Sequence, residues 1–228
     1  ANLEAAYEIA PIRARIEKVR ELRENSDEAG YQRIANRPHQ FRDRMVAQEH
    51  TIAVPTVSSE KREYLPVVLL DSGSVLNNQA FGLYDAPVHV VSILSSRMHL
   101  IWTATVGGRL DERLRYSNVL VWNTFPFSDL TQQQMDALEE ASWRILSERE
   151  QHPNLTISDL YDPKRMPNDL RQAHIEADAL VESIYIGRPF SSDRERLEHL
   201  FKRYKLLLGR EEVPLLVRKT GRRSKLNA

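Results

Sequence analysis

The spacing of apolar residues changes along this 228-residue chain, and each change predicts a different kind of structure. Near the start, Pro11 suits the first turn of a helix. Apolar positions at helical spacing follow it, namely Ile12, Ile16, Val19 and Leu22. This predicts a connecting helix with one core-facing stripe. Residues 25–49 are polar and irregular, and they predict a long loop with little core of its own.

Between residues 50 and 93 the apolar residues instead come in short runs that are typical of β-strands. Polar turn segments separate four such runs, which cover residues 51–57, 64–71, 79–84 and 87–94. Helical spacing returns over residues 93–106, and Gly107 and Gly108 end that helix. Residues 119–122 predict one more strand. We therefore expect a small β-rich unit with an inserted helix.

The chain after residue 128 is predicted to be helical. Thr131 with Gln134, and Ser192 with Glu195, match the capping-box pattern that begins a helix. A third helix is expected to begin at Pro167 and to end at Gly187. These three amphipathic helices predict a small bundle.

Together these segments predict an α+β protein with four parts. The expected parts are a connecting helix and loop, a β-rich domain, a C-terminal helical bundle and a basic tail, at residues 1–36, 37–127, 128–209 and 210–228.

Composition narrows the possible functions. The 32 Lys and Arg residues balance the 32 Asp and Glu residues, so binding to a polyanion would need a local basic patch. The absence of cysteine excludes disulfides, thiolate catalysis and cysteine-based metal sites. No apolar run approaches the roughly 20 residues that cross a bilayer, and we expect a soluble, cytoplasmic protein without a membrane partner. Because Ala1 stands where an initiating Met would, we expect a piece of a longer protein.

Sequence patterns of catalysis are missing. No Gly-rich turn joins a predicted strand to a helix, and the serine pairs lack a nucleophile-elbow frame. The carboxylates are scattered, and the histidines form no pair at metal-ligand spacing on a helix. His99 lies beside an apolar stripe and is expected at the edge of the core. We therefore expect no catalytic, cofactor-binding or metal-binding residue in this chain.

An arginine-dense, turn-rich segment follows the helix predicted over residues 93–106. Arg109, Arg113 and Arg115 lie within seven positions, interleaved with polar residues. Such residues supply donors for phosphates and donors and acceptors for base edges, which favours a DNA-contacting surface. Two alternatives stay open from the residues alone. One is a helical protein-interaction or scaffolding module without DNA contact, and the other is a metal-dependent phosphodiesterase that uses the scattered carboxylates.

Several segments of the chain resemble the C-terminal half of MmeI-like DNA methyltransferases of the type IIL restriction-modification class. These single-chain bacterial proteins combine nuclease, methylase and target-recognition parts. The similarity covers almost the whole chain. Its strongest segments are VPTVSSEKREYLPV (residues 54–67), ILSSRMHLIW (93–102), GRLDERLRYSN (108–118) and NTFPF (123–127), with residues 160–174 and 187–204 in the helical part.

The resemblance implies a target-recognition domain with a helical extension that binds double-stranded DNA. It also implies an upstream domain of the same polypeptide that binds S-adenosylmethionine and methylates adenine N6. The family's cofactor-binding glycine motif and its Asn-Pro-Pro-Tyr-type catalytic motif do not occur in this sequence. The resemblance therefore implies recognition in this chain, with no cofactor of its own.

The family's base-reading residues are expected in the turn after residues 108–110, which implies Asp111, Arg113 and Arg115 here. A carboxylate accepts from cytosine N4 and a guanidinium spans guanine O6 and N7, so Asp111 and Arg113 can read one C·G pair together. From the sequence alone, an exposed ion pair between these two side chains explains them equally well.

The remaining expected contacts complete the candidate interface. Asn78 and Gln79 offer amides that suit adenine. Phosphate contacts are expected from Ser58, Lys61, Arg62, Ser95, Arg97, Arg109 and Ser117. Tyr116 and Trp122 lie beside apolar residues, and we expect them to pack inside the protein instead of stacking on bases.

Overall fold

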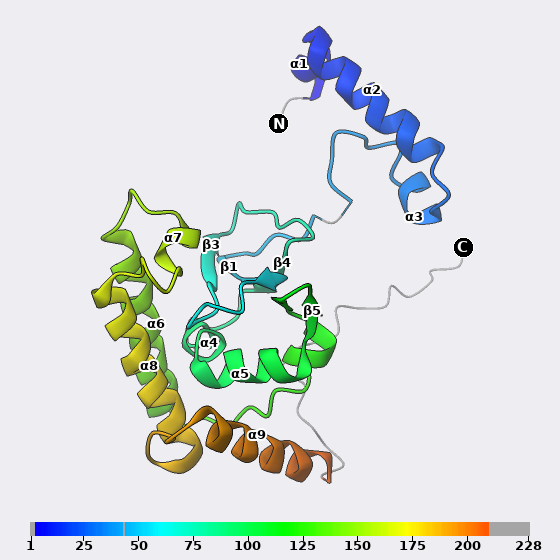
Figure 1. Cartoon of the computed structure of the whole chain (residues 1–228). Coiled ribbons are helices and arrows are strands. Elements are labelled where there is room, and N and C mark those ends of the chain that lie inside the picture. The colour runs from blue at the N-terminus through cyan, green and yellow to red at the C-terminus, as the bar shows by residue number, and fades with distance from the viewer. Residues whose placement is uncertain (1–2, 43, 210–228) are drawn as a thin grey trace. The chain divides into compact units, whose positions relative to one another are not determined.

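The computed structural model describes residues 3–42 and 44–209, which form two compact units (Figure 1). The first unit combines residues up to Val46 with Val75–Asn77. The second combines Ala47–Ser74 with the residues from Asn78 onward. The basic tail expected at residues 210–228 lies outside the described residues.

The first unit contains the helices α1 (Leu3–Glu8), α2 (Ala10–Glu24) and α3 (Ala29–Gln32). Pro11 lies in the first turn of α2, as predicted. In the predicted apolar stripe, however, Ile16 is buried whereas Ile12 and Leu22 are exposed.

Arg23 organises the segment that was predicted to be a long loop. Its guanidinium donates hydrogen bonds to the backbone oxygens of Ile34, Arg37 and Gln40, at 3.2, 2.8 and 2.8 Å. Ile34 is buried in this turn-rich segment. One side chain thus satisfies several carbonyls, so the segment has more fixed structure than its polar composition predicts.

The second unit contains two three-stranded antiparallel sheets. One has the order β3-β1-β4, from Val68–Asp71, His50–Pro55 and Ala80–Tyr84. The other has the order β2-β6-β5, from Val57–Ser58, Arg113–Arg115 and Gly108–Leu110. The predicted runs at residues 51–57 and 79–84 are therefore in strands, whereas in the run at residues 64–71 only the second half is.

Two predicted strands are helical. Residues 87–94 contain the helix α4 (Val90–Leu94), in which the Ser92 hydroxyl donates to the Leu138 backbone oxygen at 2.9 Å. Residues 119–122 belong to the π-helix η1 (Asn118–Trp122), which Ser117 caps by accepting from the Leu120 amide. Short apolar runs fit either conformation, and contacts distant in sequence decide between them.

The inserted helix and most of the C-terminal helices begin at polar caps, whereas the helix that follows Pro167 has no side-chain cap. The inserted helix is α5 (Arg97–Val106), and the later ones are α6 (Gln132–Glu150), α7 (Ile157–Leu160), α8 (Asn168–Ile186) and α9 (Asp193–Leu208). The capping box at Thr131 and Gln134 is complete, and Gly187 ends α8 with a left-handed φ of 72°.

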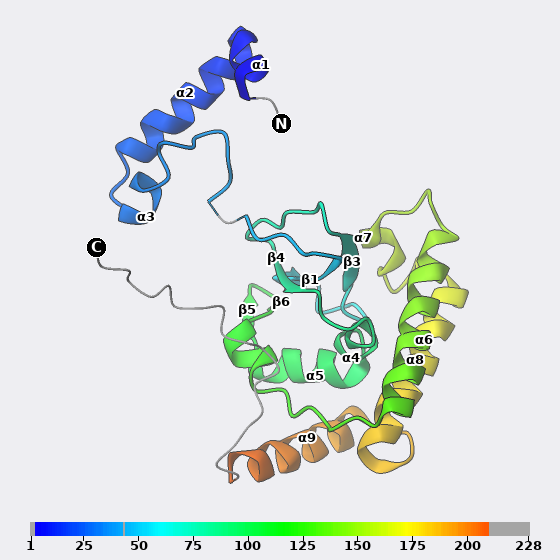
Figure 2. The same ribbon diagram turned by 180° about the vertical axis from the view of Figure 1, so that it is seen from behind.

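The packing of these helices differs from the predicted three-helix bundle. Helices α6 and α8 lie side by side, whereas α9 packs chiefly against α5 (Figures 1 and 2). The α+β class and the helical C-terminal region are confirmed. The difference lies in α9, whose apolar face covers α5: the Trp102 ring lies 5.0 Å from Phe201 and 5.8 Å from Tyr204.

The described residues form two hydrophobic clusters, and one of them joins the sheets to the C-terminal helices. It includes Val54 of β1, Trp102 of α5, Leu138 of α6 and Leu200 of α9, each almost fully buried. The inserted helix α5 is therefore the element on which both the strands and α9 depend. None of the helices in the described part of the chain is long and apolar enough to cross a membrane.

Candidate nucleic-acid interface

The arginine-dense segment forms a β-hairpin, made of β5 and β6. Asp111 and Glu112 are the two residues of its turn, because Leu110 pairs with Arg113 and Gly108 pairs with Arg115. Asp111 has a φ of 56°, in the left-handed region that Asp tolerates better than most residues with a side chain. The alternation along β6 buries Leu114, while Arg113 and Arg115 are exposed.

Gly107 connects the hairpin to α5. A Cβ atom at this position would lie 2.4 Å from the Thr103 backbone oxygen and 3.0 Å from that of Arg115. The absence of a side chain therefore lets the end of α5 and the start of β5 approach β6 closely. This approach holds the hairpin against the helix that anchors the core.

Thr56 joins a second candidate segment to the hairpin. Its backbone amide and its hydroxyl both donate to the Gln79 backbone oxygen, at 2.9 and 3.0 Å. Its own backbone oxygen accepts from the Tyr116 amide at 2.9 Å. The turn that carries Asn78 and Gln79, both exposed, is thus held beside the end of β6.

On its other side, β6 pairs with β2, where Ser58 lies opposite Leu114. The turn after β2 carries Lys61 and Arg62. Residues from three separate stretches, at 58–62, 78–79 and 109–117, therefore gather around one small sheet. We call the exposed residues of these stretches the hairpin surface.

The two residues at the tip of the hairpin form an ion pair. The Arg113 guanidinium lies 3.3 Å from the Asp111 carboxylate, with side chains that are 52% and 81% exposed. Such exposed pairs contribute little to stability, typically less than about 1 kcal/mol. Each of the two side chains can therefore leave this ion pair and bind a stronger partner. Arg115 is exposed and has no side-chain hydrogen bond or ion pair with any residue that the structure describes.

Four of the expected phosphate contacts are exposed or half-buried in the three stretches around this sheet. Lys61 is exposed, and its ammonium group bonds to nothing within the described ranges. Arg109 is exposed and donates to the Glu112 backbone oxygen at 3.0 Å. Arg62 is half-buried and donates to the Ser58 hydroxyl at 3.3 Å. Desolvation lowers the pKa of Arg62, against the opposing charge of Asp162. Ser117 is half-buried and caps η1.

Of the other three expected phosphate contacts, the two serines are buried and Arg97 is paired with a carboxylate. Ser58 and Ser95 are 4% and 1% exposed. Arg97 donates from Nε and Nη2 to the Asp193 carboxylate, at 3.2 and 2.6 Å, and this hydrogen bond is the main cause that raises its pKa. In this conformation these side chains support the fold, and the structure does not bring their donors to the hairpin surface.

The sequence did not predict a buried hydrogen bond between His99 and Tyr116. His99, which was expected at the edge of the core, is fully buried, and its Nε2 lies 3.0 Å from the Tyr116 hydroxyl. Burial lowers the pKa of His99 to about 3, so the ring is neutral. Tyr116 is 5% exposed, which agrees with the expected packing role. No local sequence signal marks this pair or Thr56, because their roles depend on neighbours that are distant in the chain.

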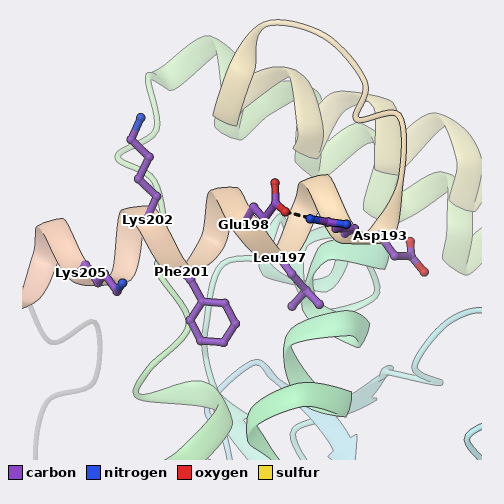
Figure 3. A pocket seen from close by; sticks show the side chains of 7 residues that line it. Asp193, Leu197, Glu198, Phe201, Lys202 and Lys205 are labelled. Carbon is purple, nitrogen blue, oxygen red and sulfur yellow. Dashed lines mark hydrogen bonds and ion pairs between the residues drawn. The ribbon is translucent and has the colours of Figure 1, made fainter.

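A groove of about 820 Å³ runs along α9, and none of the residues that line it belongs to the hairpin surface. Figure 3 shows Leu197 and Phe201 on one side of the helix and Lys202 on another. The charged residues that line the groove include both acids and bases, and Arg194 pairs with Glu198. Among the described residues no group of His, Asp or Glu side chains could hold a metal ion.

Comparison with known proteins identifies the family. The family described as MmeI, target recognition domain, matches residues 1–129, which is more than half of the chain. The chain belongs to the MmeI family. The MmeI C-terminal domain matches residues 130–210, the helical region that begins before α6. The resemblance found in the sequence is thereby confirmed.

Two relatives place the chain within longer proteins. It is 40% identical over 199 residues to DNA methyltransferase A of Bacillus subtilis strain 168, a match that covers 87% of this chain and 22% of that protein. It also matches the solved structure of the type IIL restriction-modification enzyme MmeI in complex with DNA, with a TM-score of 0.82 and 34% identity. That match covers 90% of this chain and 28% of the MmeI chain. The chain thus spans about a quarter of each relative.

Proposed function

We propose that this chain is the sequence-specific DNA-recognition module of a DNA methyltransferase of a restriction-modification system. The observation that carries the proposal is the hairpin surface. Three stretches of sequence supply it with arginines, a lysine, a carboxylate and amides, and it lies in a member of the MmeI target-recognition family. MmeI itself, which the chain resembles, has been solved in complex with DNA.

Base reading is assigned to Asp111, Arg113 and Arg115, with Asn78 and Gln79 beside them. A bidentate contact to a base discriminates by about 1–3 kcal/mol, whereas an exposed ion pair contributes less than about 1 kcal/mol. DNA therefore competes favourably for Asp111 and Arg113, which pair with each other in its absence. Asn78 and Gln79 suit adenine, because an amide matches its N6 and N7.

Phosphate contacts are assigned to Lys61, Arg62, Arg109 and Ser117. Three of these residues are cations, and they hold the duplex without reading its sequence. For Ser58, Ser95 and Arg97 we now propose supporting roles. Arg97 fixes the start of α5 to Asp193, and α5 in turn carries the hairpin.

The catalytic part of the proposal concerns the longer protein. We propose that a domain upstream of this chain binds S-adenosylmethionine and methylates adenine N6 in the cytoplasm. Support comes from the name of the Bacillus subtilis relative and from the small share of each relative that the chain spans. This chain would select the site, and the upstream domain would perform the chemistry.

Titration of the chain with duplex DNA at several salt concentrations tests the recognition role. Each neutralised phosphate contributes about −0.9 to the slope of log K against log salt. Contacts from Lys61, Arg62 and Arg109 therefore predict a slope of about −3. A protein-interaction module gives no binding or no slope, and either result would contradict the proposal. Metal-dependent cleavage of the duplex would instead favour a phosphodiesterase.

Lys61→Ala is the most direct variant for this titration, because no described residue bonds to the Lys61 ammonium group. We expect weaker binding to all duplexes alike and a slope that is smaller in magnitude by about one. Lys202→Ala, which removes an exposed lysine of α9, is the matched control and should leave the slope unchanged. Equal slopes in the wild type and both variants would remove Lys61 from the interface.

A further inference from the structure

Leu110 is a large apolar side chain at an unusual place in the hairpin. It is 43% exposed and precedes the turn directly. Residues that pair directly across an antiparallel ladder project to the same face, so Leu110 shares a face with Arg113. Arg115, two positions further along β6, shares that face as well. Its own partner, Gly108, has no side chain.

Leu114 provides the contrast within the same hairpin. It projects to the opposite face and is 3% exposed, as a core leucine should be. Leu110 instead adds apolar surface to the face that carries Arg113 and Arg115, which we call the arginine-bearing face; Arg109, opposite Leu114, projects to the other face. Single exposed leucines are common on proteins and need no explanation by themselves. The position of Leu110 beside two residues proposed to read bases, before Asp111 in the chain and opposite Arg113 in the ladder, is what suggests a role.

We infer that Leu110 recognises the C5-methyl group of a thymine in the major groove. This inference rests on the proposed function, which places Arg113 and Arg115 at the base edges of that groove. The major-groove edges carry hydrogen-bond donors and acceptors, and thymine alone among the four bases adds an apolar group there. Two apolar side chains of this sheet share the face of Arg113 and Arg115, namely Leu110 and the half-buried Val57, which pairs with Arg115. Leu110 is the exposed one of the two, and the thymine methyl is its chemical complement.

The geometry also restricts where the thymine lies. Directly paired residues have Cβ atoms about 4.5–5.5 Å apart, and base pairs follow one another every 3.4 Å or so along a strand. Leu110 therefore reaches the base pair adjacent to the one that Arg113 reads, or the next one. Leu110 thereby joins the side chains proposed to read bases as a further specificity-determining residue.

Replacement of thymine by deoxyuridine tests this inference, because it removes only the methyl group. The preferred duplex is first selected from a random pool by binding to the chain, and each thymine is then replaced in turn. We expect one replacement to weaken binding about fourfold, which corresponds to about 0.8 kcal/mol for one buried carbon group. In Leu110→Ala, the same replacement should have no effect, while replacements elsewhere behave as in the wild type.

The controls separate this inference from the proposed function. Leu206→Ala removes an exposed leucine of α9 and should keep the full effect of deoxyuridine. The inference is wrong if every thymine is replaceable, if Leu110→Ala keeps the sensitivity, or if the selected site has no A·T pair. Those results, with a normal salt slope, leave the proposed function intact. Failure of the chain to bind any duplex contradicts both.

Discussion

At the residue scale, the ion pair between Arg113 and Asp111 governs what the hairpin tip can bind. Both side chains are more than half exposed, so water screens their attraction and neither is held firmly. Neither side chain has to break a strong internal bond in order to contact DNA. The buried Arg196–Glu182 pair differs, because its carboxylate is only 2% exposed.

His99 lies at the opposite extreme of exposure, and its burial predicts a pH effect on stability. Its pKa is about 3 in the folded chain and about 6.5 when unfolded. Below pH 6.5 the unfolded state therefore binds a proton that the folded state excludes. The free energy of unfolding should fall as the pH drops from about 6.5 towards 3, by up to about 1.4 kcal/mol per pH unit from this histidine.

Urea unfolding at pH 7.5, 6 and 5 measures this effect, with His99→Gln as the variant. Glutamine cannot titrate, so the variant should show a shallower fall than the wild type. Burial also lowers the pKa of His174, which adds to the wild-type slope, and raises that of Asp178 to about 7, which opposes it. Both remain in the variant and cancel in the comparison. Parallel slopes would show that His99 is protonated in the folded chain.

At the element scale, the end of α8 and the start of α9 are joined by buried charges. Glu182 accepts from the Phe190 amide at 2.6 Å and pairs with Arg196 at 2.6 Å. Arg196 also bonds to Asp193, which bonds to Arg97 of α5. This network links α9 to α8 through Glu182 and to α5 through Arg97.

Arg196→Ala would leave Glu182 buried without its cation. We expect the free energy of unfolding to fall by about 3 kcal/mol, which is typical for one broken buried pair. Arg194→Ala, on the same helix, removes an exposed pair with Glu198 and should leave stability essentially unchanged. Chemical denaturation of both variants makes the comparison. Equal stabilities would contradict the structural role of this network.

The difference between local and distant contacts explains which elements the sequence predicts correctly. The limits of α6 and α8 follow from Thr131 and Gly187, whose capping chemistry acts within a few residues. The α4 helix was predicted as a strand. Its Ser92 bonds to α6, between 46 and 50 residues later in the chain, and a local sequence pattern does not show such a contact. At Ser192 only one of the two capping-box hydrogen bonds forms, the one from the Glu195 amide to the Ser192 hydroxyl. Glu195 bonds to Ser191 instead of completing the box with the Ser192 amide.

At the scale of the whole molecule, the candidate interface was predictable by residue type and less so by position. The alternation along β6 leaves Arg113 and Arg115 exposed, on either side of the buried Leu114. Ser95 and Arg97 lie in one of the segments that resemble the family most strongly, yet one is buried and the other pairs with Asp193. A motif identifies a segment, but it does not tell which of its polar side chains face solvent. The packing of α9 decides that for Arg97.

The central claim is that the hairpin reads bases, and a double variant of the full-length protein tests it most directly. Asp111→Asn with Arg113→Gln replaces both charged groups by amides, and Asn tolerates the left-handed backbone at position 111. The control is Arg194→Gln with Glu198→Gln, which removes an exposed ion pair from α9.

The measurement is the DNA sequence motif that each protein methylates. We expect the hairpin variant to change or relax one position of the motif, because amides match adenine and not a C·G pair. The α9 control should methylate the wild-type motif. An unchanged motif in an active hairpin variant would contradict base reading by Asp111 and Arg113.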